Sequence, residues 1–379
     1  RYEFFSSQLN FIGTLCRFSS VLKETGLKKK DLKTNALKLT LKEYNNKFPK
    51  GVYIPICKPM GKYYKVTRIA YTESASLNSR DRVPYIMCVE VSEDSPGDNE
   101  TAHEVSGGRH SPRITKFTGF KKKQIMDEWI VIDKKDKEEK DDCEAPMQRK
   151  AFGETWEEKK AKIKASSPQQ NKKDWRLFSF IVKAGDDLRQ EQLAMQLIKI
   201  FYDIYKQEDL PLWIRPYAVL ATGSDSGLIE TVTDAISIHT LKQRTGLTSL
   251  REYFVQSYGE NTPRLKQCQR NFVESLAGYS IICYLLQIKD RHNGNELIDR
   301  EGHIIHIDYG FMLTNSPGYI NWETAPFKLT TDLVDVMRCK NDNMFETYFK
   351  PLFAQGFKAV RKHYKRIVYL VEIMLEGTM

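Results

Sequence analysis

Two short polar segments late in the chain are separated by a stretch with the pattern of a β-hairpin. The first is Lys-Asp-Arg-His-Asn-Gly-Asn at residues 289–295, and the second is His-Ile-Asp-Tyr-Gly at residues 306–310. Between them, Leu-Ile-Asp at 297–299 and His-Ile-Ile-His-Ile at 303–307 flank a turn at Arg-Glu-Gly, which predicts two paired strands. Because the connection is this short, the polar side chains at its two ends can converge on one place.

These side chains have the chemistry of a phosphotransferase site. Asp290 precedes Asn295 by five positions and Asp308 by eighteen. Phosphoryl transfer uses one carboxylate to orient the attacking hydroxyl, and an Asp and an Asn to hold magnesium on the phosphates. Each segment alone could be a polar helix exit or a turn, so the prediction depends on their joint order and spacing.

A lysine and a glutamate upstream fit the same chemistry. Lys183 ends a predicted strand, and Glu191 lies in the first turns of the following helix. In kinase sites a strand lysine reaches the ATP phosphates and a helix carboxylate holds it in place. Alone, the pair would be a surface salt bridge worth about 0.2–1 kcal/mol, and the downstream segments favour the kinase interpretation.

The secondary-structure pattern predicts an α+β fold, two-lobed and protein-kinase-like, preceded by a helical segment. Asp186 or Asp187 is expected to cap the helix that carries Glu191. Strands are expected at residues 52–56, 63–70, 84–91, 175–183, 217–221 and 227–232. The predicted domains are residues 1–47 for the end of a helical domain, 48–232 for a β-rich N-lobe with a mobile insertion at about 92–150, and 233–379 for a helical C-lobe.

Charge and cysteine usage narrow the class of protein. The net charge of +10 favours anionic partners, but the basic residues are spread out without a nucleic-acid module, so we expect no nucleic-acid binding. The seven cysteines form no Cys-x-x-Cys pair, which indicates reduced thiols in a cytosolic protein. His303 and His306 would point to opposite faces of a strand, which argues against zinc. The longest apolar stretch, about residues 279–288, is shorter than the ~20 residues of a membrane span.

The sequence resembles the phosphatidylinositol 3- and 4-kinase superfamily. The order Asp-Arg-His-Asn-x-Asn, inverted relative to the His-Arg-Asp of protein kinases, is characteristic of that group, and residues 181–191 are similar to its lysine strand and helix. The closest likeness is to the type III beta branch of the phosphatidylinositol 4-kinases. It runs through Pro-Leu-Trp-Ile at 211–214, Asp-Ser-Gly-Leu-Ile-Glu at 225–230, Asn-Phe-Val at 271–273 and Phe-Lys-Leu-Thr-Thr at 327–331.

The resemblance implies a nucleotide site that binds ATP. Lys183 would contact the ATP phosphates, Glu191 would position it, and Tyr217 would border the inner pocket. The adenine-binding hinge would comprise Ile229, Glu230, Thr231 and Val232, and Ser166, Ser167 and Pro168 would form the phosphate-covering loop.

The resemblance also implies the residues that perform the transfer. Asp290 and His292 would serve the lipid hydroxyl and the developing phosphate charge. Asn295 and Asp308 would bind Mg²⁺, with Mn²⁺ as the alternative ion. The implied reaction moves the ATP γ-phosphate to the 4-hydroxyl of phosphatidylinositol in membranes.

The segment after the second polar run bears on the substrate. Residues 311–326 contain no Lys or Arg, and Lys328 is the first cation after them. A headgroup with extra phosphates would need several cations, so Lys328 alone suits plain phosphatidylinositol. The following apolar side chains could touch acyl chains or pack against the C-lobe: Met312, Leu313, Tyr319, Ile320 and Trp322.

Three further classes of function stay open, and two features depart from the family. A phosphatidylinositol 3-kinase, a superfamily protein Ser/Thr kinase and a non-catalytic recruitment module are the alternatives.

The resemblance implies a cytoplasmic protein, peripheral on Golgi or related membranes, with small GTPases and Golgi adaptor proteins as partners. Met337-Arg338-Cys339 replaces the family's Met-Gly-Gly. The family's kinase domain continues with helices beyond residue 379, and the start at Arg1 indicates an excised segment.

Overall fold

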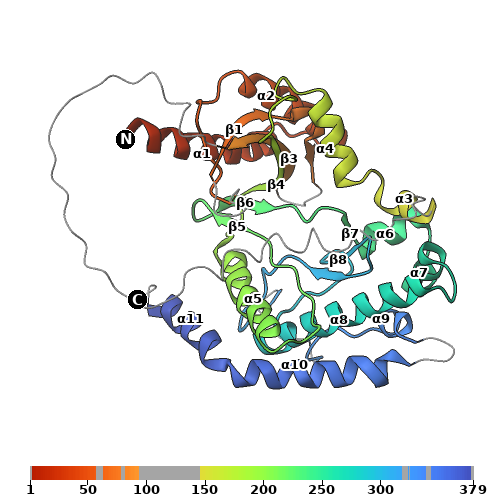
Figure 1. The fold of residues 1–379 in the computed structure, drawn as a ribbon. Helices are drawn as coiled ribbons and strands as arrows, with labels where there is room; N and C mark the ends of the chain where they lie inside the picture. The colour runs from red at the N-terminus through yellow and green to blue at the C-terminus, as the bar shows by residue number, and fades with distance from the viewer. Residues whose placement is uncertain are drawn as a thin grey trace. The chain divides into compact units, whose positions relative to one another are not determined.

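The computed structural model describes residues 2–56, 63–77, 82–93, 146–317, 323, 325–338 and 343–376. Almost all of the expected insertion lies outside these residues. Within the described part the fold is α+β, as predicted, with two N-terminal helices, antiparallel strands and a helix-rich C-terminal part (Figure 1). The chain forms two compact units, which are residues 1–142 with 164–182 (unit 1) and residues 143–163 with 183–379 (unit 2). The lobe boundary expected at residue 232 falls inside unit 2 and stays a prediction.

Unit 1 begins with two helices, which confirms the helical pattern at the N-terminus. They are α1 (Tyr2–Glu24) and α2 (Lys30–Asn45). Phe11 and Leu15 from α1 and Leu37 from α2 have no exposed surface, because the apolar residues of each helix recur at helical spacing. The Phe11 ring stacks on Tyr44 with 6.0 Å between centroids, so the two helices share one apolar core.

The strands of unit 1 pair antiparallel around β3 (Tyr85–Glu93). Its partners are β1 (Tyr64–Ile69), β2 (Ala75–Ser76) and β4 (Arg176–Ala184), and the 3-10 turn η2 (Tyr71–Glu73) precedes β2. The expected strand at 52–56 was wrong, since only a single bridge, Tyr53 to Lys65, forms there. Pro55 lacks the N–H that a continued ladder requires.

A buried carboxylate joins the segment before β4 to the sheet of unit 1. Glu90 on β3 has no exposed surface, and its Oε1 accepts a 2.5 Å hydrogen bond from Arg68 Nη1. Its Oε2 accepts hydrogen bonds from the Ser167 hydroxyl and, at 3.0 Å, from Trp175 Nε1. One charge therefore satisfies three donors from distant parts of the chain.

Replacement of Glu90 by Gln is expected to destabilise unit 1 by about 2–3 kcal/mol, because the buried donors lose their charged acceptor. Urea denaturation followed by tryptophan fluorescence would measure the change, since Trp175 is one of the three donors. Glu43→Gln, which alters an exposed glutamate of α2, is the matched control and should stay within about 0.5 kcal/mol of the parent. Equal stability of the two variants would contradict the role assigned to Glu90.

After residues 143–163, unit 2 resumes at residue 183 with the end of β4 and with α5 (Arg189–Gln207). Along α5, Leu197, Phe201 and Ile204 are buried, whereas Leu193 and Ile200 are half-buried. The prediction that Asp186 or Asp187 is the N-cap residue was wrong, because the N-cap is the next residue, Leu188. Asp187 still accepts a 3.0 Å hydrogen bond from the Arg189 N–H, and so serves the exposed helix end.

The rest of unit 2 is mostly helical, as predicted, and is organised around one long helix, α8. The hairpin of β5 (Val219–Ala221) and β6 (Ser226–Glu230) follows α5. Strand β5 lies within the expected range of 217–221, and β6 begins one residue before the expected range of 227–232. The helices are α3 (Pro146–Phe152), α4 (Trp156–Ala165), α6 (Ile238–Thr245), α7 (Leu250–Tyr258), α8 (Pro263–Leu286), α9 (Thr331–Val336), η5 (Phe345–Phe349), α10 (Lys350–Lys362) and α11 (Tyr364–Glu376). In the described part of the chain, every helix is too short or too polar to cross a bilayer.

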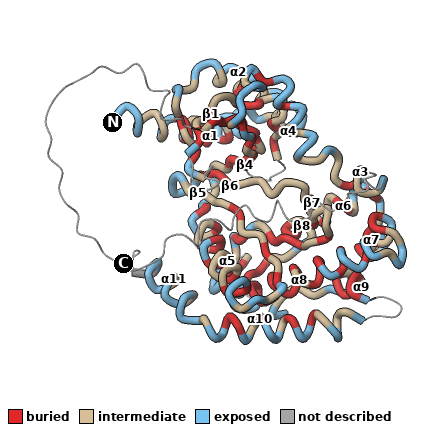
Figure 2. Tube along the Cα trace, viewed as in Figure 1, coloured by how far each residue is buried: buried red, intermediate tan, exposed pale blue. Residues whose placement is uncertain are grey.

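Helix α8 is buried along most of its length (Figure 2). It begins at the Thr262 cap, followed directly by Pro263, and ends at Gln287 in the left-handed conformation. A Cβ on Gly356 of α10 would lie 2.6 Å from Ile281 Cδ1, so α10 approaches α8 closely at a residue without a side chain. This helix is the platform on which the site of unit 2 is built.

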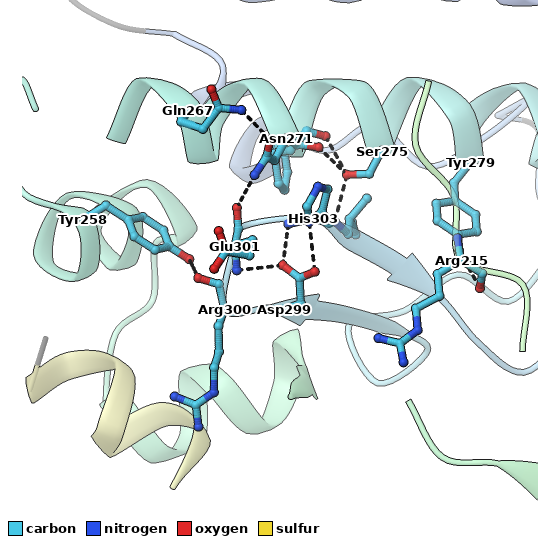
Figure 3. A network of polar contacts seen from close by, with 12 residues as sticks. Arg215, Tyr258, Gln267, Asn271, Ser275, Tyr279, Asp299, Arg300, Glu301 and His303 are labelled. Atoms are coloured by element: carbon cyan, nitrogen blue, oxygen red, sulfur yellow. Dashed lines mark hydrogen bonds and ion pairs between the residues drawn. The ribbon is translucent and has the colours of Figure 1, made fainter. Parts of the chain in front are cut away.

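The predicted hairpin is present and is hydrogen-bonded to α8. In the described chain β7 (Ala235–Ser237), β8 (Glu296–Asp299) and β9 (Ile304–His306) form an antiparallel sheet in that order. Ser275 Oγ accepts from the Ile304 N–H at 2.9 Å, and Asn271 Nδ2 donates to the Glu301 carbonyl at 2.8 Å (Figure 3). Both side chains lie on α8, so the helix fixes the hairpin and the polar segments at its ends.

The turn of the hairpin also holds α3 in place. Arg300 Nη2 donates to the Gly153 carbonyl at 3.0 Å, and Gln148 Nε2 donates to the Arg300 carbonyl at 3.0 Å. The Arg300 guanidinium also lies 4.9 Å from the centre of the Phe152 ring. Helix α3 is therefore part of unit 2, although residues 164–182, which begin with the last two residues of α4, belong to unit 1.

Candidate active site

The lysine and glutamate expected to act together are paired. Lys183 Nζ lies 3.7 Å from Glu191 Oε2 and 3.6 Å from Asp186 Oδ2. Tyr217 donates its hydroxyl hydrogen to Glu191 Oε1 at 2.7 Å, so both carboxylate oxygens of Glu191 are engaged. The side chains of Lys183 and Glu191 are 21% and 6% exposed, which excludes the ordinary surface salt bridge as the explanation.

The electrostatics of this pair bring Asp308 into the same site. Burial alone would lower the pKa of Lys183, but the carboxylates of Glu191, Asp308 and Asp186 outweigh it, and the pKa is raised. Burial raises the pKa of Glu191 despite the nearby ammonium and the Tyr217 hydroxyl, and Asp308 adds to that rise. Asp308 is therefore close enough to Lys183 and Glu191 to act on both charges.

The two polar segments lie side by side, as the hairpin predicted. The Lys289 N–H donates to the Phe311 carbonyl at 3.0 Å, and the Ile307 N–H donates to the Asn295 carbonyl at 3.0 Å. Asp290 and Asp308 both have left-handed backbones, with φ of 59° and 62°. Asp and Asn adopt this conformation more readily than most residues, and non-glycine residues held there cluster at functional sites.

Arg291 ties the two segments together, a role that the sequence reasoning missed. Its Nε donates to the Lys289 carbonyl at 3.2 Å and its Nη1 to the Ile307 carbonyl at 2.7 Å. Its Nη2 donates to the carbonyl of Asp308. A guanidinium has five donors in a rigid fork, so one side chain can fix both loops. An arginine that directly follows the first aspartate was the only signal in the sequence.

His292 faces Asp290 and depends on the glycine two positions later. Its Nδ1 accepts from the Gly294 N–H at 3.0 Å, so the ring hydrogen is on Nε2, which lies 4.0 Å from Asp290 Oδ2. A Cβ on Gly294 would lie 2.8 Å from His292 Cε1. The histidine can therefore keep this position only while residue 294 has no side chain.

Replacement of Gly294 by Ala is expected to displace the His292 ring and to lower kcat of the proposed reaction by about tenfold or more, as small misplacements of catalytic groups do. Steady-state kinetics would measure the loss, with ATP binding unchanged. Gly13→Ala on α1, where a Cβ would meet nothing within 4 Å, is the control. Full activity of Gly294→Ala would show that the His292 position is not required.

The residues expected to bind a metal have the donor atoms that magnesium prefers. Asn295 is buried, and its Nδ2 donates to the Asp290 carbonyl at 3.0 Å, which leaves Oδ1 as the ligating atom. The Asp308 carboxylate is exposed and has one long contact, 3.4 Å, with the Gly310 N–H. A carboxylate and an amide oxygen beside the lysine predicted to bind phosphates would fit a magnesium ion that also binds substrate phosphates.

The predicted hinge residues lie at the end of the β5–β6 hairpin, where Ile229 and Glu230 are the last residues of β6. Glu230 accepts from the Ala218 N–H through Oε2 and donates its own N–H to the Ala218 carbonyl, both at 2.8 Å. Ile229 is buried, and Thr231 and Val232 follow the end of β6. The contacts do not test adenine binding, so the roles of Ile229, Glu230, Thr231 and Val232 stay predictions.

The predicted phosphate-covering loop belongs to unit 1. Ser166 is exposed, whereas Ser167 is buried, with its hydroxyl directed to Glu90. Ser167 therefore has a structural contact that the sequence reasoning did not foresee. The covering role of Ser166 and Ser167 stays a prediction.

Lys328 and its neighbours form a second set of charges. Lys328 Nζ donates to Asn293 Oδ1 at 2.9 Å and to Glu296 Oε2 at 2.5 Å. Burial raises the pKa of Glu296 and lowers that of His306 well below its usual range. The substrate cation predicted from the sequence is therefore already held by a buried carboxylate, which sequence reasoning missed.

The apolar residues that could touch lipid or pack against the C-lobe are only partly described. Met312 is buried, which favours packing, whereas Leu313 is partly exposed and has φ of 55°. Lys289 Nζ donates to the carbonyls of Leu313 and Asn315 at 2.8 and 3.2 Å and so fixes the start of this segment. Tyr319, Ile320 and Trp322 lie outside the described residues, as does Cys339.

Comparison with known proteins gives a family match over the same region. The family model described as "Phosphatidylinositol 3- and 4-kinase" matches residues 177–379, a little over half of the chain. The match includes Lys183, Glu191, Asp290, Asn295 and Asp308.

Individual relatives are similar over longer or shorter parts. "Phosphatidylinositol 4-kinase beta" of Rattus norvegicus is 38% identical over 420 residues, covering 92% of this chain and 51% of the relative. "Phosphatidylinositol 4-kinase beta 1" of Arabidopsis thaliana is 57% identical over 229 residues, covering 59% of this chain and 20% of the relative. "Phosphatidylinositol 4-kinase" of Dictyostelium discoideum is 53% identical over 228 residues, covering 60% of this chain and 19% of the relative. The chain thus spans about half or less of the length of these relatives.

Proposed function

The chain belongs to the phosphatidylinositol 3- and 4-kinase family, and we propose that it transfers the γ-phosphate of ATP to the 4-hydroxyl of phosphatidylinositol. The observation that carries the proposal is the buried Lys183–Glu191 pair, on which the charge of Asp308 also acts. The 290–295 loop is hydrogen-bonded beside Asp308 in the same unit. The names of these relatives, each a phosphatidylinositol 4-kinase, support the substrate and the position of transfer.

Each residue of the site has a role in this reaction. The Lys183 ammonium binds the ATP phosphates, and Glu191, held by Tyr217, keeps it directed at them. Asp290 accepts a hydrogen bond from the lipid hydroxyl and orients it for in-line attack. His292, with its ring hydrogen on Nε2 beside Asp290, donates to the negative charge that develops on the transferred phosphoryl group.

A divalent ion belongs to this proposal. Asn295 Oδ1 and the Asp308 carboxylate would hold Mg²⁺, or Mn²⁺ in its place, and the ion when bound neutralises charge on the ATP phosphates. Arg291 fixes the positions of Asn295 and Asp308 relative to each other, because it donates hydrogen bonds to the carbonyls of both residues.

The setting of the reaction is carried over from the family resemblance as part of the proposal. The substrate would be reached at a cytoplasmic membrane face of the Golgi or a related compartment by peripheral attachment. Small GTPases and Golgi adaptor proteins would recruit the protein there. Imaging of the tagged protein against Golgi markers would test the location, and a distribution without any membrane enrichment would contradict it.

The reaction itself is tested with radiolabelled ATP and vesicles. Phosphatidylcholine vesicles with phosphatidylinositol should yield a labelled lipid, and vesicles without it should yield none. Chromatography of the deacylated product separates the 4-phosphate from the 3-phosphate and so decides between a 4-kinase and a 3-kinase. Label on added protein substrates instead would indicate a protein kinase. Failure to bind ATP in calorimetry would favour a recruitment module.

A further inference from the structure

A chain of buried polar side chains runs from helix α8 through the β8–β9 hairpin to the loop at residues 290–295, called the catalytic loop below. Its members are Cys283, His306, Glu296, Lys328 and Asn293. Cys283 Sγ lies 3.4 Å from His306 Nδ1, and His306 Nε2 lies 3.7 Å from Glu296 Oε1. Glu296 Oε2 accepts from Lys328 Nζ at 2.5 Å, and Lys328 Nζ also donates to Asn293 Oδ1 at 2.9 Å. The chain therefore connects the helical core to the loop between Asp290 and Asn295.

The central contact of this chain fixes the direction of the Glu296 carboxylate. Glu296 Oε1 and His306 Nε2 are buried without a hydrogen-bond partner in the described structure, and they face each other. Since a thiol can donate to Nδ1, the ring hydrogen of His306 would be on Nε2 and directed at Oε1. The Tyr279 ring, 4.6 Å away and nearly parallel, holds the imidazole in its plane. One oxygen of Glu296 thus faces the core and the other faces Lys328.

Burial of the charged Glu296 side chain costs free energy of folding. It has no exposed surface, and its strand neighbour Ile298 is equally buried, so an apolar side chain would fit the position without desolvating a charge. The charge has one strong partner outside the hairpin, the Lys328 ammonium, 32 positions later in the chain. A buried carboxylate directed at one ammonium determines where that ammonium lies.

We propose that Glu296 is a positioning residue, which holds the Lys328 ammonium against the catalytic loop to receive the diester phosphate of the lipid. The inference rests on the proposed function for the identity of that phosphate. An ammonium has three donors, and the contacts described use two of them, to Glu296 and Asn293. The Lys328 side chain is 15% exposed, so the third donor can be reached from outside.

The placement of Lys328 is tested without any reference to activity. Amine-reactive labelling read by mass spectrometry should modify Lys328 slowly in the parent protein and clearly faster in Glu296→Gln, because the amide no longer anchors the ammonium. Lys350, whose side chain is 53% exposed on α10, is the internal reference and should react equally in both. Equal labelling of Lys328 in the two proteins would overturn the positioning role.

The kinetic test separates positioning from a general loss of structure. Glu296→Gln should raise KM for phosphatidylinositol about tenfold, the loss expected for one charged hydrogen bond, with KM for ATP unchanged. In a protein that already carries Lys328→Gln, the change Glu296→Gln should raise KM for phosphatidylinositol no further, since the two residues act together. Glu301→Gln is the matched control on the same hairpin, where the Glu301 side chain forms an ion pair with Arg264 at the surface.

The outcomes distinguish this proposal from the one on which it rests. If the parent phosphorylates no lipid, the proposed function fails, while the labelling still decides whether Glu296 holds Lys328. A fall in kcat with an unchanged KM for lipid, or additive effects in the double variant, would overturn the inference. Should Glu296→Gln not fold, Glu296→Asp keeps the charge one methylene further back and serves for both measurements.

Discussion

Replacement of Asp308 by Asn is expected to lower the rate of phosphoryl transfer by about 10³-fold or more, because several kcal/mol of charge stabilisation by the bound metal is lost. Asn keeps the size of the side chain and tolerates the left-handed backbone at this position, where φ is 62°. Loss of the negative charge, and not strain, is therefore the cause of the effect. The measurement is the steady-state rate with saturating ATP and phosphatidylinositol vesicles.

Calorimetry adds a second measurement for Asp308. Magnesium should strengthen ATP binding to the parent and should add little in the variant. Asp209→Asn is the matched control, since Asp209 is an exposed aspartate with φ of 50° at the end of α5. Asp209→Asn should leave both the rate and the metal dependence unchanged. An active Asp308→Asn variant would remove Asp308 from the proposed metal site.

Replacement of Asp290 by Asn should lower kcat by about 10²–10⁴-fold, the usual contribution of a positioned acid–base group. The φ of 59° again makes Asn the substitution that preserves the backbone. In contrast to Asp308→Asn, this variant should bind ATP with magnesium as well as the parent does, because Asp290 acts on the lipid hydroxyl. Loss of magnesium-dependent ATP binding in Asp290→Asn would show that the two aspartates have the same role.

Local patterns in the sequence predicted the parts of the fold that depend on neighbouring residues. The helices at the N-terminus, the strand before Lys183, helix α5 and the β8–β9 hairpin all follow from apolar spacing and turn residues. The Lys183–Glu191 pair was predictable because both residues lie near one junction between a strand and a helix. The strand expected at 52–56 failed because alternation of apolar residues does not show whether a pairing partner can accept a proline.

Contacts between distant residues were not predictable from the sequence. Glu90 meets Ser167 across 77 positions, and Glu296 meets Lys328 across 32. Neither glutamate differs in local pattern from a solvent-exposed one, because burial is decided by the sheet and hairpin that assemble around it. Arg291 was passed over for a similar reason, since its acceptors are main-chain carbonyls, which leave no trace in the sequence.

The docking of α3 on the hairpin has a consequence for folding during synthesis. Gln148 bonds the Arg300 carbonyl across 152 positions, and Arg300 bonds the Gly153 carbonyl across 147. At ribosomal speeds of about 5–20 residues per second, α3 would leave the ribosome roughly 8–30 s before its partners exist. During that interval these two hydrogen bonds cannot form, and the native partners of α3 that already exist lie earlier in the chain, such as Arg244, which donates to the Ala151 carbonyl at 2.8 Å. The final position of α3 is therefore fixed only after the hairpin has been synthesised.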